Sequence, residues 1–312
     1  MGNADKSLSG NSSVDVLVSV FLPLSLGIIM LSLGLGLRVA DFVRVIQQPR
    51  AVFAGLFAQV ILLPIIVYGF VVAFGVSGEL AFGFMLLAAS PGGVTSNILT
   101  KLVGGTLALS ISLTGLISLL SVITVPLLAA FWAGLFLDAG DVTVNVTSLA
   151  LKMFAITAVP VAIGMAIRAA ANRFATRIEP ALSFMAAVLF VIIVIAAVAA
   201  SWDVLVANWA TLAPMTALMV LCLLALGWSV ARALGLPVAD RAAIGMETGI
   251  QNSTVAITLA GILHAGPEAL PVIALPAAMY GILMYLGALP GGYLMYRVTK
   301  GAARAPAQAP SF

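Results

Sequence analysis

Long apolar runs separated by short polar joints make up nearly the whole chain. Nine of these runs reach the length of about 20 residues that a helix needs to cross a bilayer. They cover residues 14–37, 51–75, 79–103, 106–136, 146–168, 181–200, 209–234, 241–263 and 269–296. Because the apolar positions are continuous rather than alternating, the pattern predicts membrane-spanning helices and not the strands of a barrel.

The composition agrees with this pattern. Hydrophobic residues make up 62% of the chain and charged residues only 8%, whereas roughly a quarter of a soluble domain is charged. Such a chain cannot cover a water-facing surface, so we expect an all-α polytopic membrane protein with one transmembrane domain at residues 14–300 and flexible ends at 1–13 and 301–312. The first run is too long for a signal-peptide core and is counted as a span. The single cysteine, Cys222, excludes a disulfide within the chain and a thiolate metal cluster.

The basic residues predict how the spans are oriented. With nine spans, twelve of the 14 Lys and Arg residues fall on one side of the membrane, and only Lys6 and Lys152 fall on the other. Basic residues gather on the cytoplasmic side of membrane proteins. We therefore expect a multi-pass protein of the cell (inner) membrane with its N-terminus outside and its C-terminus in the cytoplasm.

Two of the predicted spans are interrupted at mid-depth. The third contains SPGGVTSN at residues 90–97, and the eighth contains METGIQNSTV at 246–255. Pro and Gly break helices, and a broken backbone at this depth is tolerated only where it is buried in protein or lines a cavity. The two spans run in opposite directions, which is typical of an inverted-repeat transporter. Spans 1–4 would then correspond to spans 6–9, with span 5 unpaired.

Polar residues inside the predicted spans indicate an ion site. Glu247 is the only acidic residue deep in a span, where a carboxylate is costly and normally serves ions, protons or substrate, although it can also cap a broken helix. Ser110 and Thr114 share one helix face because they are four residues apart. Further oxygen atoms come from Gln59, Ser96, Asn97 and the carbonyls freed by the break at 247–251. One carboxylate with neutral oxygens suits sodium, although each hydroxyl taken alone also fits a bond to its own helix.

The same residues resemble a known family. SPGGVTSN at 90–97, ALSISLT at 108–114 and ETGIQNS at 247–253 are similar to motifs of the bile acid:sodium symporter family, and the likeness covers nearly the whole chain. The resemblance implies an inverted repeat of five helices, of which this chain lacks the first, with two crossed broken helices. It also implies a panel of the spans near 14–37, 146–168 and 181–200, and a core of the spans near 51–136 and 209–296.

The resemblance also implies specific site residues. The first sodium site would use Ser96, Asn97, Ser110, Thr114 and Glu247. The second would use Gln59, Glu247 and Gln251 with the backbone oxygens of Thr248 and Ile250. The half-helix end after Gly93 offers amide donors and a positive dipole end to an anion, and the expected substrate contacts are Thr95, Asn252, Met284 and Tyr285.

The sequence does not identify the substrate. Bacterial relatives often have a His-Asn pair in the last span, where this chain has Met284 and Tyr285. Family substrates include bile acids, pantoate-like hydroxy acids, oxo acids and sulfated metabolites. The expected partners are therefore sodium, a small organic anion and the lipid bilayer, with no nucleic acid and no cofactor.

Three other functions are alternatives to a sodium symporter. A proton-coupled carrier would use Glu247 as its proton site, and a passive channel would need no coupling. An intramembrane enzyme is disfavoured because His264 is the only histidine, no serine at depth has a basic partner, and Glu247 has no second carboxylate beside it.

Overall fold

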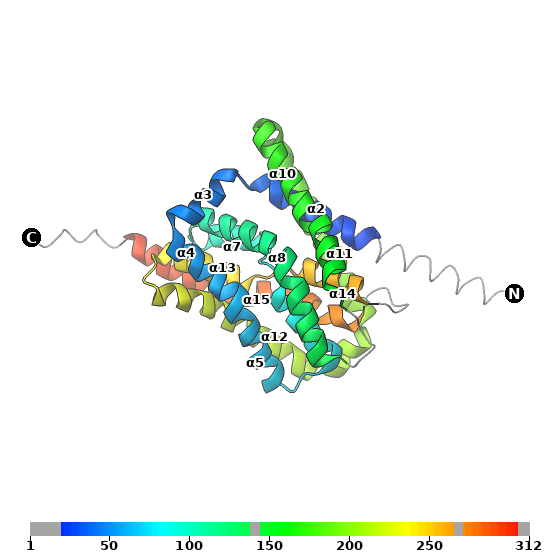
Figure 1. Cartoon of the computed structure of the whole chain (residues 1–312). Helices are drawn as coiled ribbons and strands as arrows, with labels where there is room; N and C mark the ends of the chain where they lie inside the picture. The colour runs from blue at the N-terminus through cyan, green and yellow to red at the C-terminus, as the bar shows by residue number, and fades with distance from the viewer. Residues whose placement is uncertain (1–19, 138–143, 265–270, 305–312) are drawn as a thin grey trace, which may run out of the picture.

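The computed structural model describes residues 20–137, 144–264 and 271–304. The described residues are helical apart from short joints, and their one β-type pairing is an isolated antiparallel bridge between Gly92 and Gln251. The all-α prediction is therefore confirmed (Figure 1). The predicted flexible end at 1–13 lies outside the described residues, as do residues 138–143 and 265–270.

The first part of the chain runs from α2 to α8. In chain order it contains α2 (Leu22–Gly36), α3 (Val39–Gln47), α4 (Pro49–Leu56), the π-helical segment η2 (Phe57–Leu62), α5 (Leu63–Ala73), α6 (Gly78–Ala89), α7 (Val94–Leu102) and α8 (Leu107–Phe136). The second part contains α9 (Val146–Met153), the π-helical segment η3 (Phe154–Ala158), α10 (Val159–Ala170), α11 (Asn172–Ala200), α12 (Trp202–Ala233), α13 (Val238–Gly249), α14 (Ser253–Leu263), the short η4 (Val272–Ala274) and α15 (Leu275–Arg304).

Within the described ranges, six helical stretches are long and apolar enough to cross a membrane. They are Pro49–Ala73, Leu107–Phe136, Val146–Ala170, Asn172–Ala200, Trp202–Ala233 and Val272–Ala302, and shorter apolar helices cover Leu22–Gly36, Gly78–Ala89 and Ser253–Leu263. Each interrupted span of the sequence is a pair of helices, α6 with α7 and α13 with α14. Large apolar side chains such as Phe53, Ile123 and Phe184 are more than half exposed, as expected for a surface in contact with lipid.

Several helix ends differ from the predicted ones. Helix α11 begins at Asn172 rather than 181, α12 begins at Trp202 rather than 209, and α15 continues to Arg304 into the end predicted to be flexible. Hydropathy marks the part of a helix that lies in lipid, whereas backbone hydrogen bonding continues into polar residues beyond it. Three helices end at glycines with positive φ, which are Gly75, Gly104 and Gly235, because a left-handed residue there closes the last turn.

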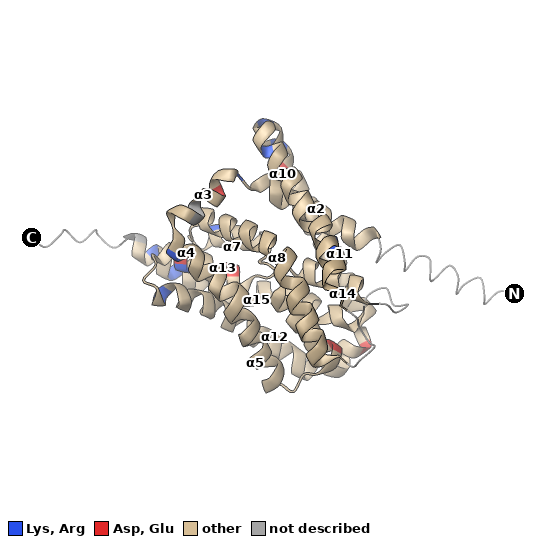
Figure 2. Cartoon of the chain, in the orientation of Figure 1, with Lys and Arg blue, Asp and Glu red and all other residues tan. Residues whose placement is uncertain are grey.

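Helices α2, α10 and α11 pack against one another and lie together on one side of the molecule (Figure 1). Gly34 and Gly164 bring the backbones of α2 and α10 together, since a methyl group added at Gly164 would lie 2.6 Å from the carbonyl oxygen of Leu31. On the other side, α12 packs along α13 and α15, and α6 packs along α8. Basic side chains gather near α3, α4 and α13 and at the end of α10 that leads into α11 (Figure 2).

Candidate ion-binding and substrate-binding site

The first break separates α6 from α7. Helix α6 ends at Ala89, and Ser90 takes an extended conformation with φ −70° and ψ 153°. The cause is local, because the residue before a proline is pushed out of the helical region, and Pro91 follows Ser90. Helix α7 then begins after Gly93, which is also extended.

The second break separates α13 from α14 and contains no proline. Ile250 is extended with φ −114° and ψ 99°. Side chains complete the hydrogen bonding of this helix end: the Tyr280 hydroxyl donates to the Gly249 carbonyl at 2.8 Å, and Gln251 Nε2 donates to the Thr248 carbonyl at 2.8 Å. These donors take up carbonyl groups that the last turn of a helix leaves without partners.

The two breaks are bonded to each other. The amide of Gly93 donates to the Ile250 carbonyl at 2.9 Å, and the amide of Asn252 donates to the Pro91 carbonyl at 2.9 Å. A methyl group added at Gly92 would overlap the Glu247 carboxylate, and one added at Gly93 would lie 3.1 Å from the Gln251 carbonyl oxygen. The close approach of the two breaks therefore leaves no room for a side chain at Gly92 and little room at Gly93.

The carboxylate of Glu247 lies at the meeting point of three helices and is 1% exposed. Its Oε2 accepts hydrogen bonds from Ser96 of α7 at 2.6 Å and from Ser110 of α8 at 3.2 Å. Its Oε1 accepts one from Thr114 of α8 at 2.7 Å. Asn97 lies beside this group, with its Oδ1 3.4 Å from the Thr114 hydroxyl. All five residues expected for the first sodium site are thus brought together.

Thr100 belongs to the same cluster but was not among the site residues predicted from the sequence. It is fully buried, and its hydroxyl donates to Ser110 Oγ at 3.2 Å. The available signal was its place four residues after Ser96, which puts both side chains on one face of α7.

The side chains of Gln59 and Gln251 form a second polar group. Gln59 Nε2 donates to Gln251 Oε1 at 2.7 Å and approaches the Ser90 carbonyl at 3.4 Å. Gln59 sits in the π-helical segment η2, a type of turn that is frequent at functional sites. The carbonyls of Thr248 and Ile250, expected here as ligands, accept hydrogen bonds from Gln251 and Gly93 respectively. Four of the five members of the second expected set are therefore brought together at the breaks, whereas the side chain of the fifth, Glu247, is bonded to the first cluster.

The chemistry of these atoms fits a hard monovalent cation. One carboxylate is surrounded by hydroxyl, amide and backbone oxygens, and the described residues contain no group of three or more His, Cys, Asp or Glu that could hold a metal ion. Oxygen-only sets with few charges suit sodium, whereas transition metals prefer imidazole and thiolate.

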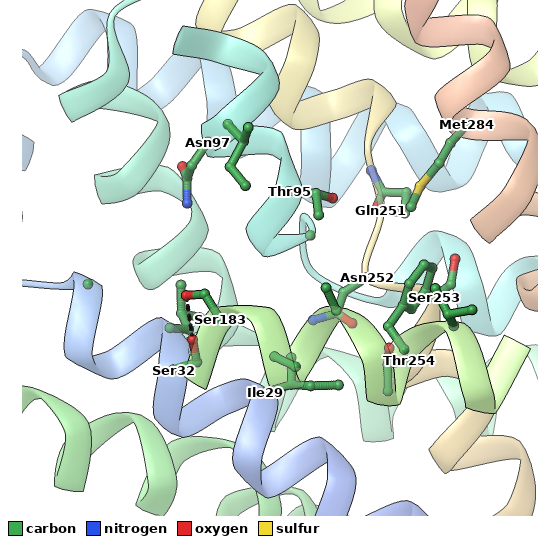
Figure 3. A pocket seen from close by; sticks show the side chains of 18 of the residues that line it. Ile29, Ser32, Thr95, Asn97, Ser183, Gln251, Asn252, Ser253, Thr254 and Met284 are labelled. Atoms are coloured by element: carbon green, nitrogen blue, oxygen red, sulfur yellow. Dashed lines mark hydrogen bonds between the residues drawn. The ribbon is translucent and has the colours of Figure 1, made fainter. Parts of the chain in front are cut away.

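A cavity of about 550 Å³ adjoins the ion cluster (Figure 3). One wall comes from α2 and α11, and the other comes from α7, the second break and α15. All four residues expected to contact substrate line it, together with two members of the ion groups: Thr95, Asn252, Met284, Tyr285, Asn97 and Gln251. The volume lies within the range of about 300–1,000 Å³ that is usual for small-molecule sites.

Two contacts define the wall on the side of the breaks. The Tyr285 hydroxyl donates to Thr95 Oγ1 at 3.1 Å, and the Tyr285 ring meets Phe190 edge-on with centroids 6.4 Å apart. Asn252 Oδ1 accepts from the amide of Val255 at 3.2 Å and so caps α14. Ser253, which was not among the predicted contacts, also lines the cavity, and its buried hydroxyl has no hydrogen-bond partner among the described residues.

Comparison with known proteins identifies the family to which this chain is similar. The profile described as the Sodium Bile acid symporter family matches residues 23–208, which includes the first break. A sodium-dependent transporter of Bacillus subtilis, YocS, is 27% identical over 85% of this chain and 79% of its own length. The ileal sodium/bile acid cotransporter of Oryctolagus cuniculus is 28% identical over 93% of this chain and 84% of its own.

A chloroplast protein named as a probable sodium/metabolite cotransporter, BASS2 of Oryza sativa subsp. japonica, is 28% identical over 84% of this chain and 60% of its own length. These relatives are transporters rather than enzymes, and they span both breaks and the long helices between them. The apolar helices, the paired breaks and the matched profile lead to one conclusion: the chain belongs to the sodium bile acid symporter family of membrane transporters.

Proposed function

We propose that this protein is a symporter that imports an organic anion with sodium by alternating access. The observation that carries the proposal is the position of Glu247. Its buried carboxylate accepts hydrogen bonds from Ser96, Ser110 and Thr114 next to a cavity. A carboxylate buried at membrane depth needs a compensating positive charge, and sodium ions supply it in this proposal.

Sodium would occupy two neighbouring sites. The first uses the cluster around Glu247, and the second uses Gln59, Gln251 and the carbonyls of Thr248 and Ile250 together with the same carboxylate. The mutual hydrogen bonds of the two glutamines keep their oxygen atoms at the breaks. A bound sodium ion would take the place of the glutamine N–H donors and coordinate the two side-chain oxygen atoms directly.

The geometry also suggests how the ion and the anion are coupled. Ser96 faces Glu247, while its neighbours Thr95 and Asn97 line the cavity. An ion that holds Ser96 therefore also fixes the first turn of α7 against the substrate. Because each ligand stabilises the same arrangement, each raises the affinity for the other by the same factor.

The anionic group of the substrate would lie at the breaks. Helices α7 and α14 both begin there, so the positive ends of their dipoles favour a negative group. Thr95, Asn252 and Ser253 add polar side chains, and Met284 and Tyr285 form an apolar wall. We propose a substrate with one anionic group and an apolar body, such as a bile acid, a pantoate-like hydroxy acid or an oxo acid.

The membrane arrangement is part of the proposal. Nine spans would form an inverted repeat, with α2, α9 to α10 and α11 as a panel and the remaining long helices as a core. The close packing of α2 with α10 and α11 supports such a panel. The N-terminus would be external and the C-terminus cytoplasmic. A reporter fused after Phe312 should then be cytoplasmic and one inserted at Asp138 external, and the opposite labelling of either would reject the arrangement.

Uptake into proteoliposomes tests the coupling ion. Taurocholate, pantoate and pyruvate should each be offered with an inward sodium gradient at fixed pH, and separately with a pH gradient without sodium. A symporter accumulates at least one of them only in the first case, whereas the proton-coupled alternative accumulates it in the second. Saturable exchange with anion preloaded inside the vesicles excludes a passive channel.

One substitution ties this result to the site. Glu247→Gln keeps the shape of the side chain but removes its charge, and it should abolish sodium-driven accumulation. Glu79→Gln is the matched control, because it makes the same charge change in the first turn of α6, away from the cavity. Sodium-driven accumulation of normal affinity in Glu247→Gln would show that the ion sites lie elsewhere.

A further inference from the structure

One carboxylate lines the cavity, on the wall opposite the breaks. Glu179 of α11 is partly buried there, and Ser183, one turn further along the helix, donates to its Oε1 at 3.0 Å. Ser183 Oγ in turn lies 2.9 Å from Ser32 Oγ of α2 (Figure 3). None of these three residues belongs to the ion groups, and an anion transporter has no evident need for a negative group in its substrate cavity.

The hydrogen bonds through Ser32, Ser183 and Glu179 all have the same direction. A hydroxyl carries a single hydrogen, and that of Ser183 is donated to Glu179. The hydrogen between the two serines must therefore come from Ser32. The hydrogen of the Ser32 hydroxyl thus points to Ser183, and that of the Ser183 hydroxyl points to the Glu179 carboxylate.

It follows that this wall offers the cavity acceptors and no donors. The atoms left over are Oε2 of Glu179 and the lone pairs of Ser32 Oγ. Ile29, Leu33 and Phe190 line the same cavity, and Glu179 is only partly exposed to water. An acceptor in such a place gains from a donor brought by a ligand. The opposite wall, with two helix N-termini, has the reverse preference and favours an anion.

We propose that Glu179 is a specificity-determining residue, which selects substrates that have a single anionic group and a hydrogen-bond donor at the opposite end, and which rejects dianions. The inference rests on the proposed function, because it takes the anionic group to lie at the breaks. The donor is a hydroxyl or an ammonium group. A second anionic group would meet the Glu179 carboxylate across an apolar space, where like charges repel strongly.

Binding of four matched probes tests this selection. Octanoate, 8-hydroxyoctanoate, 8-aminooctanoate and octanedioate share one carboxylate and differ only at the other end, and the ten-carbon series repeats the comparison at a second length. Affinities are measured by calorimetry in lipid nanodiscs with saturating sodium. The parent protein should bind the hydroxy or amino acid about tenfold or more tightly than the dianion.

The variant Glu179→Gln should reduce this difference. Its side-chain oxygen can still accept from Ser183, so the chain of hydrogen bonds is kept while the charge is removed. We expect affinity for the dianion to rise about tenfold and affinity for the amino acid to fall by a similar factor, with sodium affinity unchanged. Glu79→Gln serves again as the control of equal charge change and should preserve the ranking of the parent.

The outcomes separate the two proposals. If the probes bind in a sodium-dependent way but Glu179→Gln ranks them as the parent does, the role of Glu179 is rejected and the symport proposal stands. If no probe binds the parent and sodium itself does not bind, the proposed function fails and the role of Glu179 fails with it. A dianion that binds the parent more tightly than the hydroxy acid also rejects the selection.

Discussion

Ser96 of α7 donates a hydrogen bond of 2.6 Å to Oε2 of Glu247 in α13, across 151 positions of the chain. The bond joins the helix that follows the first break to the helix that precedes the second. Charge-assisted hydrogen bonds of this length are among the stronger ones in proteins. The two broken helices are therefore held together at the residue that carries the buried charge, and the expected effects of substitution follow from that arrangement.

Gly92→Ala should weaken sodium binding about tenfold or more. The added methyl group would overlap the Glu247 carboxylate and push it away from its hydroxyl partners. Gly134→Ala in α8 is a matched control, since nothing lies within 4 Å of its added carbon, and it should leave sodium affinity unchanged while slightly raising helix stability. Calorimetric sodium titration of both variants checks this, and parental affinity in Gly92→Ala would contradict it.

Removing the Thr114 hydroxyl should weaken chiefly the first sodium site. Thr114→Val keeps the shape of the side chain but removes the 2.7 Å bond to Glu247. A hydrogen bond to a charged group contributes about 1.5–3 kcal/mol, which corresponds to roughly 10- to 100-fold in affinity. Thr114→Ser retains the hydroxyl and should bind within a few-fold of the parent. Equal affinities of the Val and Ser variants for sodium would exclude the hydroxyl as a ligand, and Ser110→Ala should behave as Thr114→Val does.

Gln251→Ala should weaken chiefly the second sodium site and also destabilise the protein. It removes the partner of Gln59 and leaves the Thr248 carbonyl without its donor. An unsatisfied buried polar group costs about 1–3 kcal/mol. The measurement combines a thermal unfolding curve with a sodium titration. A single remaining sodium phase of normal affinity is the expected result, whereas loss of both phases would show that the sites are not separable.

Changes at Thr95 and Tyr285 should affect the anion and spare sodium. Thr95→Leu adds bulk in the cavity and should block anion binding, while Ser96 beside it keeps its bond to Glu247. Tyr285→Phe removes the 3.1 Å bond to Thr95 but keeps the ring against Phe190, so a loss of a few-fold is expected. Each ligand is titrated with and without the other by calorimetry. Anion binding equal to that of the parent in both variants would place the substrate elsewhere.

Asn252 combines a substrate contact with a structural role. Asn252→Ala should alter anion affinity and also cost about 1 kcal/mol of stability, because the side chain caps α14. Asn252→Asp keeps a capping oxygen but adds a negative charge beside the anion, so it should bind anion about tenfold more weakly. If Asn252→Asp bound the anion as tightly as the parent, the anionic group could not lie at the breaks.

The sequence by itself determined the features that depend on neighbouring residues. Continuous apolar runs predicted the helices and the membrane environment, because burial in lipid is a matter of local composition. Pro91 with Gly92 and Gly93 predicted the first break, because these residues disfavour a helix whatever their neighbours are. Glu247 was recognised as the central residue for the same reason, since a charge inside an apolar run is costly wherever the run packs.

Only the tertiary structure decided which groups meet. Gln59 and Gln251 are 192 positions apart, and the Tyr280 hydroxyl that completes the helix end at Gly249 comes from another helix. The chain from Ser32 through Ser183 to Glu179 likewise depends on how α2 packs against α11. Glu179 lies near the polar start of its helix, where a carboxylate gives no signal in the sequence. Hydrogen bonds of this kind depend on the packing of distant helices, and the periodicity along one helix carries no information about its partner.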